Sequence, residues 1–135
     1  MIRSGQKVFV DTGGWLGLAL AADPYHQRAA EAWEGLRRAG ARACTSIPVA
    51  IETFTYLDRK VDARLARAWS AGLRGVEILE CSRSDLAEAW PWLERREYHK
   101  LSLVDATSFV LLRKHRIRLV LGFDTHFAQA GFRLV

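Results

Sequence analysis

Short apolar runs alternate with longer amphipathic segments along this chain. Four of the runs have the length of buried strands: "KVFV" (7–10), "RACTS" (42–46), "VEIL" (76–79) and "RLVL" (118–121). A fifth run, "GFRLV" (131–135), fits a last strand at a sheet edge. Strands separated by helices favour parallel pairing, because a parallel connection needs a long crossover. We therefore expect a single domain over residues 1–135 with a three-layer α/β/α fold, built on a mostly parallel sheet of four to five strands.

Capping and turn residues indicate where the intervening helices begin and end. After the first strand, residues 11–24 predict a turn and a short helix. Asp23 and Pro24 then predict the start of a second helix, which ends at Gly40. Its apolar stripe consists of Tyr25, Ala29, Ala32, Trp33 and Leu36. Further helices are expected from Pro48, over 62–74, from Ser84 and Asp85, and from Ser102; Pro91 is expected to kink or divide the helix that begins at Ser84 and Asp85.

An aspartate stands inside the apolar segment "LSLVDATSF" (101–109). An ionised carboxylate that is removed from water is costly unless it is paired, hydrogen-bonded or bound to a metal. Ser102 and Asp105 also have the S-x-x-D spacing of a capping box, which satisfies backbone donors and needs no ligand. Asp105 is therefore a helix cap, an ion-pair partner or a metal ligand.

Three further carboxylates fall where the topology brings them close to Asp105. Asp11 directly follows the first strand, and Asp124 follows the fourth strand by two residues. Glu52 lies one turn into a helix that follows the second strand. The carboxyl ends of parallel strands meet at one edge of the sheet, so these four side chains are expected to converge there. Taken singly, Asp11 and Asp124 could be helix caps and Glu52 an exposed helical residue.

Convergence of four carboxylates would be costly without a cation. Two carboxylates ~4 Å apart repel by about 4 kcal/mol at an effective dielectric constant near 20. A domain of this size has a total stability of roughly 5–15 kcal/mol. Such a cluster persists if divalent cations neutralise it or if some members are protonated. Oxygen ligands suit Mg²⁺, with Mn²⁺ as a substitute, better than Zn²⁺; His126 beside Asp124 is more simply a turn residue.

Composition narrows the partners and the compartment only modestly. The net charge is +5, from 20 Lys and Arg against 15 Asp and Glu, with a pI near 9.7. This excess allows a polyanion partner without requiring one, because basic groups also favour the C-terminal ends of helices. Cys44 and Cys81 are interpreted as small buried hydrophobes in a reducing cytoplasm. The longest weakly polar stretch, residues 13–22, is shorter than the ~20 residues of a membrane-spanning helix.

Four segments together resemble the acidic motifs of the PIN-domain ribonucleases, and within them the VapC-like toxins. These segments are "VFVDTGGWLGL", "AIETFTYL", "LSLVDATSF" and "LGFDTHFAQAGF", which span nearly the whole chain. The resemblance implies that Asp11, Glu52, Asp105 and Asp124 bind Mg²⁺ or Mn²⁺ and are the catalytic residues. It implies metal-dependent hydrolysis of RNA that leaves 5′-phosphate and 3′-hydroxyl ends. It also implies an antitoxin partner and a homodimer, for which Trp15, Leu16, Leu18 and Leu20 offer an apolar surface if they are not core residues.

The chain departs from the family pattern at two glycines. Gly122 stands where the family often has a small hydroxyl residue, and Gly13 where many members have Ser or Asn. Thr12, Ser102 and Thr125 are nearby hydroxyl residues without an assigned role. If the glycines spoil the metal geometry, the alternative is a catalytically impaired RNA-binding or scaffold protein. A doubly wound phosphatase is a weaker alternative, because the first aspartate has no second acid beside it and no lysine follows the late strand.

Overall fold

A five-stranded parallel sheet forms the centre of the computed structural model, which describes residues 1–135. The strands are β1 (Lys7–Val10), β2 (Arg42–Ser46), β3 (Glu77–Leu79), β4 (Leu119–Leu121) and β5 (Arg133–Leu134). Their order across the sheet is β3-β2-β1-β4-β5, and every neighbouring pair is parallel. The predicted parallel sheet is confirmed, with the last strand at its edge.

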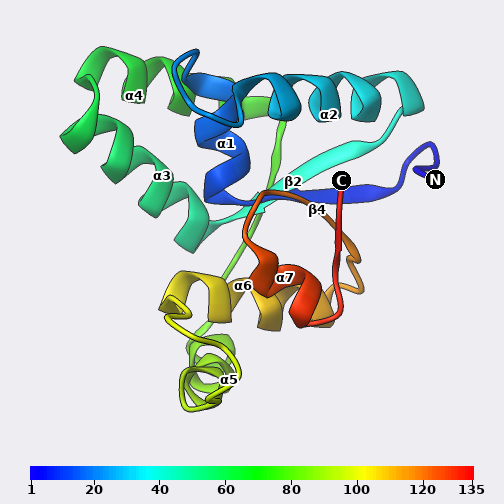
Figure 1. Cartoon of the computed structure of the whole chain (residues 1–135), viewed down its shortest axis with the longest axis vertical. Helices are drawn as coiled ribbons and strands as arrows, with labels where there is room; N and C mark the ends of the chain where they lie inside the picture. The colour runs from blue at the N-terminus through cyan, green and yellow to red at the C-terminus, as the bar shows by residue number, and fades with distance from the viewer.

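Helices cover both faces of the sheet (Figure 1). On one face, α1 (Thr12–Ala19) and α2 (His26–Ala39) connect β1 to β2, and α3 (Ile47–Lys60) and α4 (Ala63–Ala71) connect β2 to β3. On the other face, α5 (Arg83–Leu93) and α6 (Leu103–Lys114) connect β3 to β4, and α7 (Thr125–Gln129) connects β4 to β5. This division follows from the handedness of parallel crossovers, because the chain moves outward from β1 in one direction and then in the other. None of these helices combines the length and the apolar character of a membrane-spanning helix.

The reversal of strand order creates a crevice between the carboxyl ends of β1 and β4, which is where ligands bind in doubly wound sheets. Helix α1 begins at this point and lies against the end of β4. A Cβ atom on Gly14 would lie 2.3 Å from the carbonyl oxygen of Leu121, a distance that no side chain allows. Glycine at position 14 therefore permits the close approach that positions Asp11 beside β4.

The central elements are buried on both sides, as a covered parallel sheet requires. Val8, Phe9, Val10, Val120 and Leu121 have no exposed surface. Helix α6 is equally enclosed, and its residues from Asp105 to Leu112 are all buried. The expectation that Asp105 stands in a buried helix is confirmed.

Several predicted helix boundaries are wrong by a few residues. Helix α2 begins at His26, because the Asp23 carboxylate accepts the Tyr25 N–H at 2.8 Å and forms a local turn instead of a cap. It ends at Gly40, as expected, in a left-handed conformation. The segment over 62–74 is α4 followed by a short 3₁₀ turn (Gly72–Gly75). Pro91 does not divide α5, which continues to Leu93, so its missing N–H costs one bond near the helix end.

The two cysteines differ in their surroundings. Cys44 lies in β2 and is fully buried, and burial raises the pKa of its thiol to about 12. Cys81 lies after β3 and is only partly buried, so the prediction of a buried residue is wrong for this position. Neither cysteine forms a disulfide.

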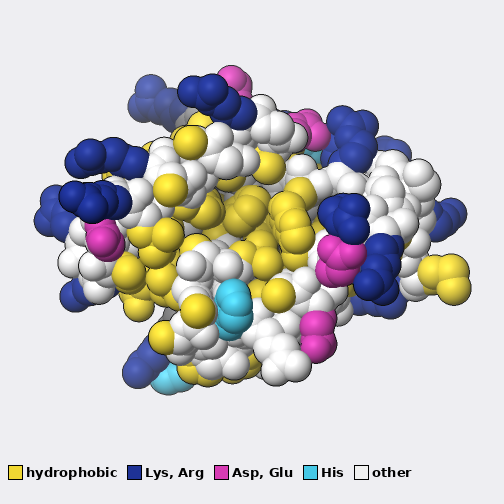
Figure 2. All heavy atoms as spheres, turned by 90° about the horizontal axis from the view of Figure 1, so that it is seen from above, with side chains coloured by type: hydrophobic (Ala, Val, Ile, Leu, Met, Phe, Trp, Pro, Cys, Tyr) yellow, Lys and Arg dark blue, Asp and Glu magenta, His cyan; other side chains and the backbone are white.

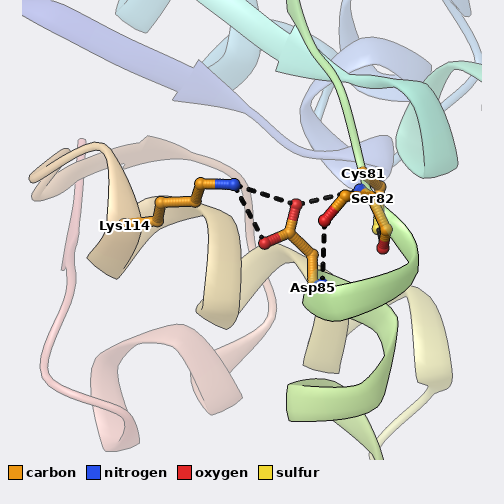
Figure 3. Close-up of polar contacts among 4 residues, drawn as sticks. All are labelled: Cys81, Ser82, Asp85 and Lys114. Atoms are coloured by element: carbon orange, nitrogen blue, oxygen red, sulfur yellow. Dashed lines mark hydrogen bonds and ion pairs between the residues drawn. The ribbon is translucent and has the colours of Figure 1, made fainter.

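A buried aspartate joins α5 to α6 (Figure 3). Asp85 accepts the backbone N–H of Ser82 at 2.9 Å, and Ser82 Oγ accepts the N–H of Asp85 at 3.0 Å, which completes a capping box. Lys114 of α6 donates to both carboxylate oxygens of Asp85, at 3.1 and 3.3 Å. The helix therefore begins at Arg83, with Ser82 as its cap, and not at Ser84 as predicted.

We expect Asp85→Asn to lower the free energy of unfolding by about 1–2 kcal/mol at pH 7, or the melting temperature by roughly 3–8 °C. Burial tends to raise the pKa of Asp85, but the Ser82 hydrogen bonds and the Lys114 charge outweigh it and hold the pKa below its usual value. This stabilisation is therefore present above about pH 4 and is lost as the pH falls through the lowered pKa. Thermal unfolding of both proteins from pH 7 to pH 3 measures it, and an unchanged difference at pH 3 would contradict the assignment.

Candidate metal centre

All four predicted carboxylates line one cavity of about 400 Å³ at the carboxyl edge of the sheet. They come from four separate elements: the end of β1, α3, the first turn of α6 and the loop after β4. The complete lining consists of Asp11, Thr12, Gly13, Leu16, Asp23, Tyr25, Glu52, Ser102, Asp105, Phe123 and Asp124. The structure thus brings together every residue of the predicted quartet.

Asp11 stands at the N-cap position of α1 but does not cap the helix. Its side chain makes no capping hydrogen bond, and its Oδ1 atom is buried without any hydrogen-bond partner. Only 4% of the residue is exposed. A buried carboxylate oxygen without a partner is unfavourable, so this atom indicates a ligand that binds in the cavity.

Asp105 uses its backbone, and not its carboxylate, for the helix cap. Its N–H donates to Ser102 Oγ at 3.0 Å, but no reciprocal bond returns from the carboxylate to Ser102. The same S-x-x-D spacing at Ser82 and Asp85 completes both bonds. The capping-box interpretation of Asp105 is therefore half right: the helix cap does not use its carboxylate, and Asp105 lines the cavity.

Glu52 is held by a hydroxyl group from the neighbouring helix. Thr12 Oγ1, at the start of α1, donates to Glu52 Oε1 at 2.6 Å. Glu52 is partly buried, so its interpretation as an ordinary exposed residue is wrong. Thr12, which had no predicted role, fixes one oxygen of this carboxylate and leaves the other for the cavity.

Asp124 does cap α7, as its simpler interpretation predicted. Its Oδ1 atom accepts the N–H of His126 at 2.9 Å, and His126 Nδ1 lies 3.1 Å from the same oxygen. One ligand atom from each of Asp105, Asp124 and His126 lies within 4.8 Å of the others. His126 is thus close to the acidic cluster, and its adjacency to Asp124 in sequence was the signal for it.

Crowding and burial make the two central carboxylates resist ionisation. Burial raises the pKa of Asp105 to about 8, and the charges of Asp11, Asp124 and Glu52 add to the rise. Burial likewise raises the pKa of Asp11 to about 7, although the backbone N–H groups of Thr12 and Gly13 oppose it. Without a cation the cluster holds protons near neutral pH, and a divalent cation would replace them.

The donor set fits a hard divalent cation. Four carboxylates line the cavity, one buried carboxylate oxygen lacks a partner, and the cavity has room for an ion with water molecules. No cysteine lines the cavity, which distinguishes it from a typical structural zinc site.

The two glycines that depart from the family pattern have different surroundings. A Cβ atom on Gly122 would lie 3.2 Å from Asp11 Cβ and 3.7 Å from its Oδ2, so glycine preserves space around that carboxylate. A Cβ atom on Gly13 would lie 4.0 Å from its nearest neighbour, the backbone nitrogen of Phe123, so this position has room for a side chain.

One of the remaining hydroxyl residues and two aromatic residues also line the cavity. Ser102 lines the cavity, whereas Thr125 is exposed and does not. Tyr25 and Phe123 also line it. Tyr25 was expected on the apolar stripe of the second helix, and no pattern in the sequence indicated a role for either aromatic residue at the cavity.

Comparison with known proteins identifies the family to which the parallel sheet and the acidic cluster belong. The PIN-domain family profile matches residues 8–133. A 23S rRNA-specific endonuclease of Mycobacterium tuberculosis, VapC20, is 39% identical over 127 residues, which cover 93% of this chain and 95% of that protein. The crystal structure of VapC20, described as a sarcin–ricin-loop-cleaving toxin, aligns with a TM-score of 0.84 and 34% identity, covering 93% and 96% of the two chains.

A more distant structure shares the fold alone. The VapBC2 complex of Rickettsia felis, bound to a DNA fragment of its promoter, aligns with a TM-score of 0.72 at 12% identity, covering 96% of this chain and 98% of that one. The chain belongs to the PIN-domain family, and the predicted resemblance to VapC-like proteins is confirmed.

Proposed function

We propose that this protein is a metal-dependent endoribonuclease and the toxin of a type II toxin–antitoxin pair, acting in the cytoplasm. The observation that carries the proposal is the convergence of Asp11, Glu52, Asp105 and Asp124 on one cavity, with a buried oxygen of Asp11 left unpartnered. The similarity to a 23S rRNA-specific endonuclease supports RNA as the substrate. We propose the sarcin–ricin loop as the first substrate to test, because VapC20 is described as a toxin that cleaves this loop.

The four carboxylates would hold Mg²⁺, with Mn²⁺ as a substitute. A bound divalent cation supplies an activated water molecule and neutralises charge on the phosphate. The chain's own residues orient the ligands: Thr12 holds Glu52, and the start of α7 holds Asp124. The excess of basic residues attracts the RNA backbone, so binding is expected to weaken as salt increases.

Two surfaces suit the protein partners that the resemblance implies. Figure 2 shows an apolar area, surrounded by Lys and Arg side chains with Asp and Glu side chains among them, on the face that carries α1, α2 and α4. A segment with apolar and acidic residues would complement this face, which we propose as the antitoxin site. Trp15 does not contribute an exposed surface, because it is buried against Trp33 and Trp69.

For the homodimer we propose a different face. An apolar groove of about 880 Å³ lies between α3, α5 and α6. Ile47, Ile51 and Tyr56 in this groove are 42%, 62% and 44% exposed, which is unusual for side chains of this size. Burial of these residues against a second copy would remove apolar surface from water.

Cleavage of a synthetic sarcin–ricin-loop hairpin tests the proposed activity. Purified protein is incubated with the labelled hairpin in Mg²⁺, in Mn²⁺ and in EDTA, and the ends of the products are analysed. We expect a single cut that requires the metal ion and leaves a 5′-phosphate. Salt-sensitive binding without cleavage would instead identify the catalytically impaired alternative. Absence of both would reject the proposed function for this RNA.

A further inference from the structure

Two aromatic rings are stacked at the margin of the acidic cavity. The rings of Tyr25 and Phe123 are nearly parallel, with an interplanar angle of 6° and centroids 4.3 Å apart. The guanidinium carbon of Arg28 lies 5.6 Å from the centre of the Tyr25 ring and 5.3 Å from that of Phe123. Both rings line the same cavity as the four carboxylates, and Phe123 directly precedes Asp124.

The side chains of Tyr25 and Arg28 do not stabilise the start of α2. Tyr25 occupies the N-cap position of α2 without a side-chain capping bond, where Ser, Thr, Asp or Asn would be favoured. Arg28 places a positive charge in the first turn, where the helix dipole disfavours cations. No carboxylate of the chain forms an ion pair with Arg28. Residues that break local rules in this way are typical of functional positions.

The exposure of Tyr25 also differs from that of a core aromatic residue. Tyr25 is 42% exposed, although its ring contacts Phe123 on one side. A hydrophobic contact between α2 and the loop after β4 needs no exposed phenol ring and no unpaired guanidinium. An exposed aromatic surface beside a cation that has no carboxylate partner is the combination that binds a nucleobase and an adjacent phosphate.

We propose that Tyr25, Phe123 and Arg28 form a base-stacking subsite, which holds one unpaired nucleobase of the RNA next to the cleaved phosphate. The proposal rests on the ribonuclease function proposed above. The Tyr25 ring would stack on the base, Phe123 would support the Tyr25 ring from behind, and the Arg28 guanidinium would contact a neighbouring phosphate. Because stacking does not depend on base identity, the subsite selects an unstacked base and not a particular sequence.

The test combines a protein variant with an RNA variant. The wild-type protein and Tyr25→Ala are each given the sarcin–ricin-loop hairpin, intact or with one abasic nucleotide at successive positions around the cut. We expect Tyr25→Ala to lower kcat/KM on the intact RNA by about 5- to 100-fold, the range for loss of one stacked base. At one position, we expect the abasic nucleotide to lower the kcat/KM of the wild type by about as much as Tyr25→Ala does on the intact RNA. The same abasic RNA should lower the kcat/KM of Tyr25→Ala little further. Additive losses at every position, or an unchanged kcat/KM for Tyr25→Ala, would overturn the proposal.

Three further variants separate stacking from a structural role. Tyr25→Phe keeps the ring and is expected to retain the wild-type kcat/KM, whereas an equal loss would exclude stacking as the cause. Arg28→Gln is expected to weaken RNA binding and to reduce the slope of log affinity against log salt by about one. Trp90→Ala removes another exposed aromatic residue, 50% exposed on α5 and outside the cavity, and should cleave like the wild type. Absence of cleavage by the wild type would reject the proposed ribonuclease function. If the wild type cleaves but the losses caused by Tyr25→Ala and by the abasic nucleotide add at every position, only the stacking subsite would be rejected.

Discussion

Asp105→Asn is expected to lower kcat by about 1000-fold or more while leaving the fold intact, a loss of ~4 kcal/mol of transition-state stabilisation. Asparagine has nearly the same shape, and its backbone N–H can still donate to Ser102 Oγ, so the start of α6 is preserved. The substitution removes a negative charge and places an amide where the cation needs a carboxylate oxygen. The measurement is single-turnover cleavage of the hairpin RNA in saturating Mg²⁺.

Asp85→Asn is the matched control for this substitution. Asp85 has the same spacing from a capping serine and lies in the first turn of the neighbouring helix, but it pairs with Lys114 outside the cavity. We expect it to cleave RNA at the wild-type rate at temperatures where it is folded. If Asp105→Asn also cleaved at the wild-type rate, Asp105 would not be a metal ligand that the reaction needs.

The same substitution at position 105 should stabilise the metal-free protein at high pH. In the folded chain the pKa of Asp11 is about 7 and that of Asp105 about 8, against an ordinary value of 3.8. The folded state therefore binds protons more tightly than the unfolded state. The stability that Asp11 and Asp105 contribute by binding these protons is fully present below about pH 4. It is lost as the pH rises through their folded-state pKa values of about 7 and 8. In EDTA, the melting temperature of the wild type is expected to fall between about pH 5 and pH 9.

Asp105→Asn removes one of these charges and the repulsion that it causes. At pH 9 in EDTA we expect this variant to be more stable than the wild type by about 2–3 kcal/mol, or roughly 5–10 °C in melting temperature. Addition of Mg²⁺ should raise the melting temperature of the wild type and have much less effect on the variant, because ligand binding stabilises the folded state. Equal melting temperatures in EDTA at pH 9 would show that the cluster is not electrostatically strained.

The sheet and its covering helices were predictable from the sequence, because the apolar runs are short, well separated and flanked by turn residues. The end of α2 at Gly40 and the start of α6 after Ser102 were predictable for the same reason. The start of α2 was not, because Asp23 can cap a helix or close a turn, and only the geometry of the chain decides between them.

Taken alone, the sequence determined which carboxylates follow which strands, and therefore that Asp11, Glu52, Asp105 and Asp124 would meet at one edge. Only the tertiary structure decided what each side chain does there. The two S-x-x-D segments show this best: Asp85 turns back to its own helix cap and pairs with Lys114, whereas Asp105 leaves its cap half made and faces three other acids. Local spacing is the same in both, so the choice depends on charges contributed by distant segments. The Thr12–Glu52 bond and the Tyr25–Phe123 stack likewise join residues far apart in the chain, and no local pattern encodes such contacts.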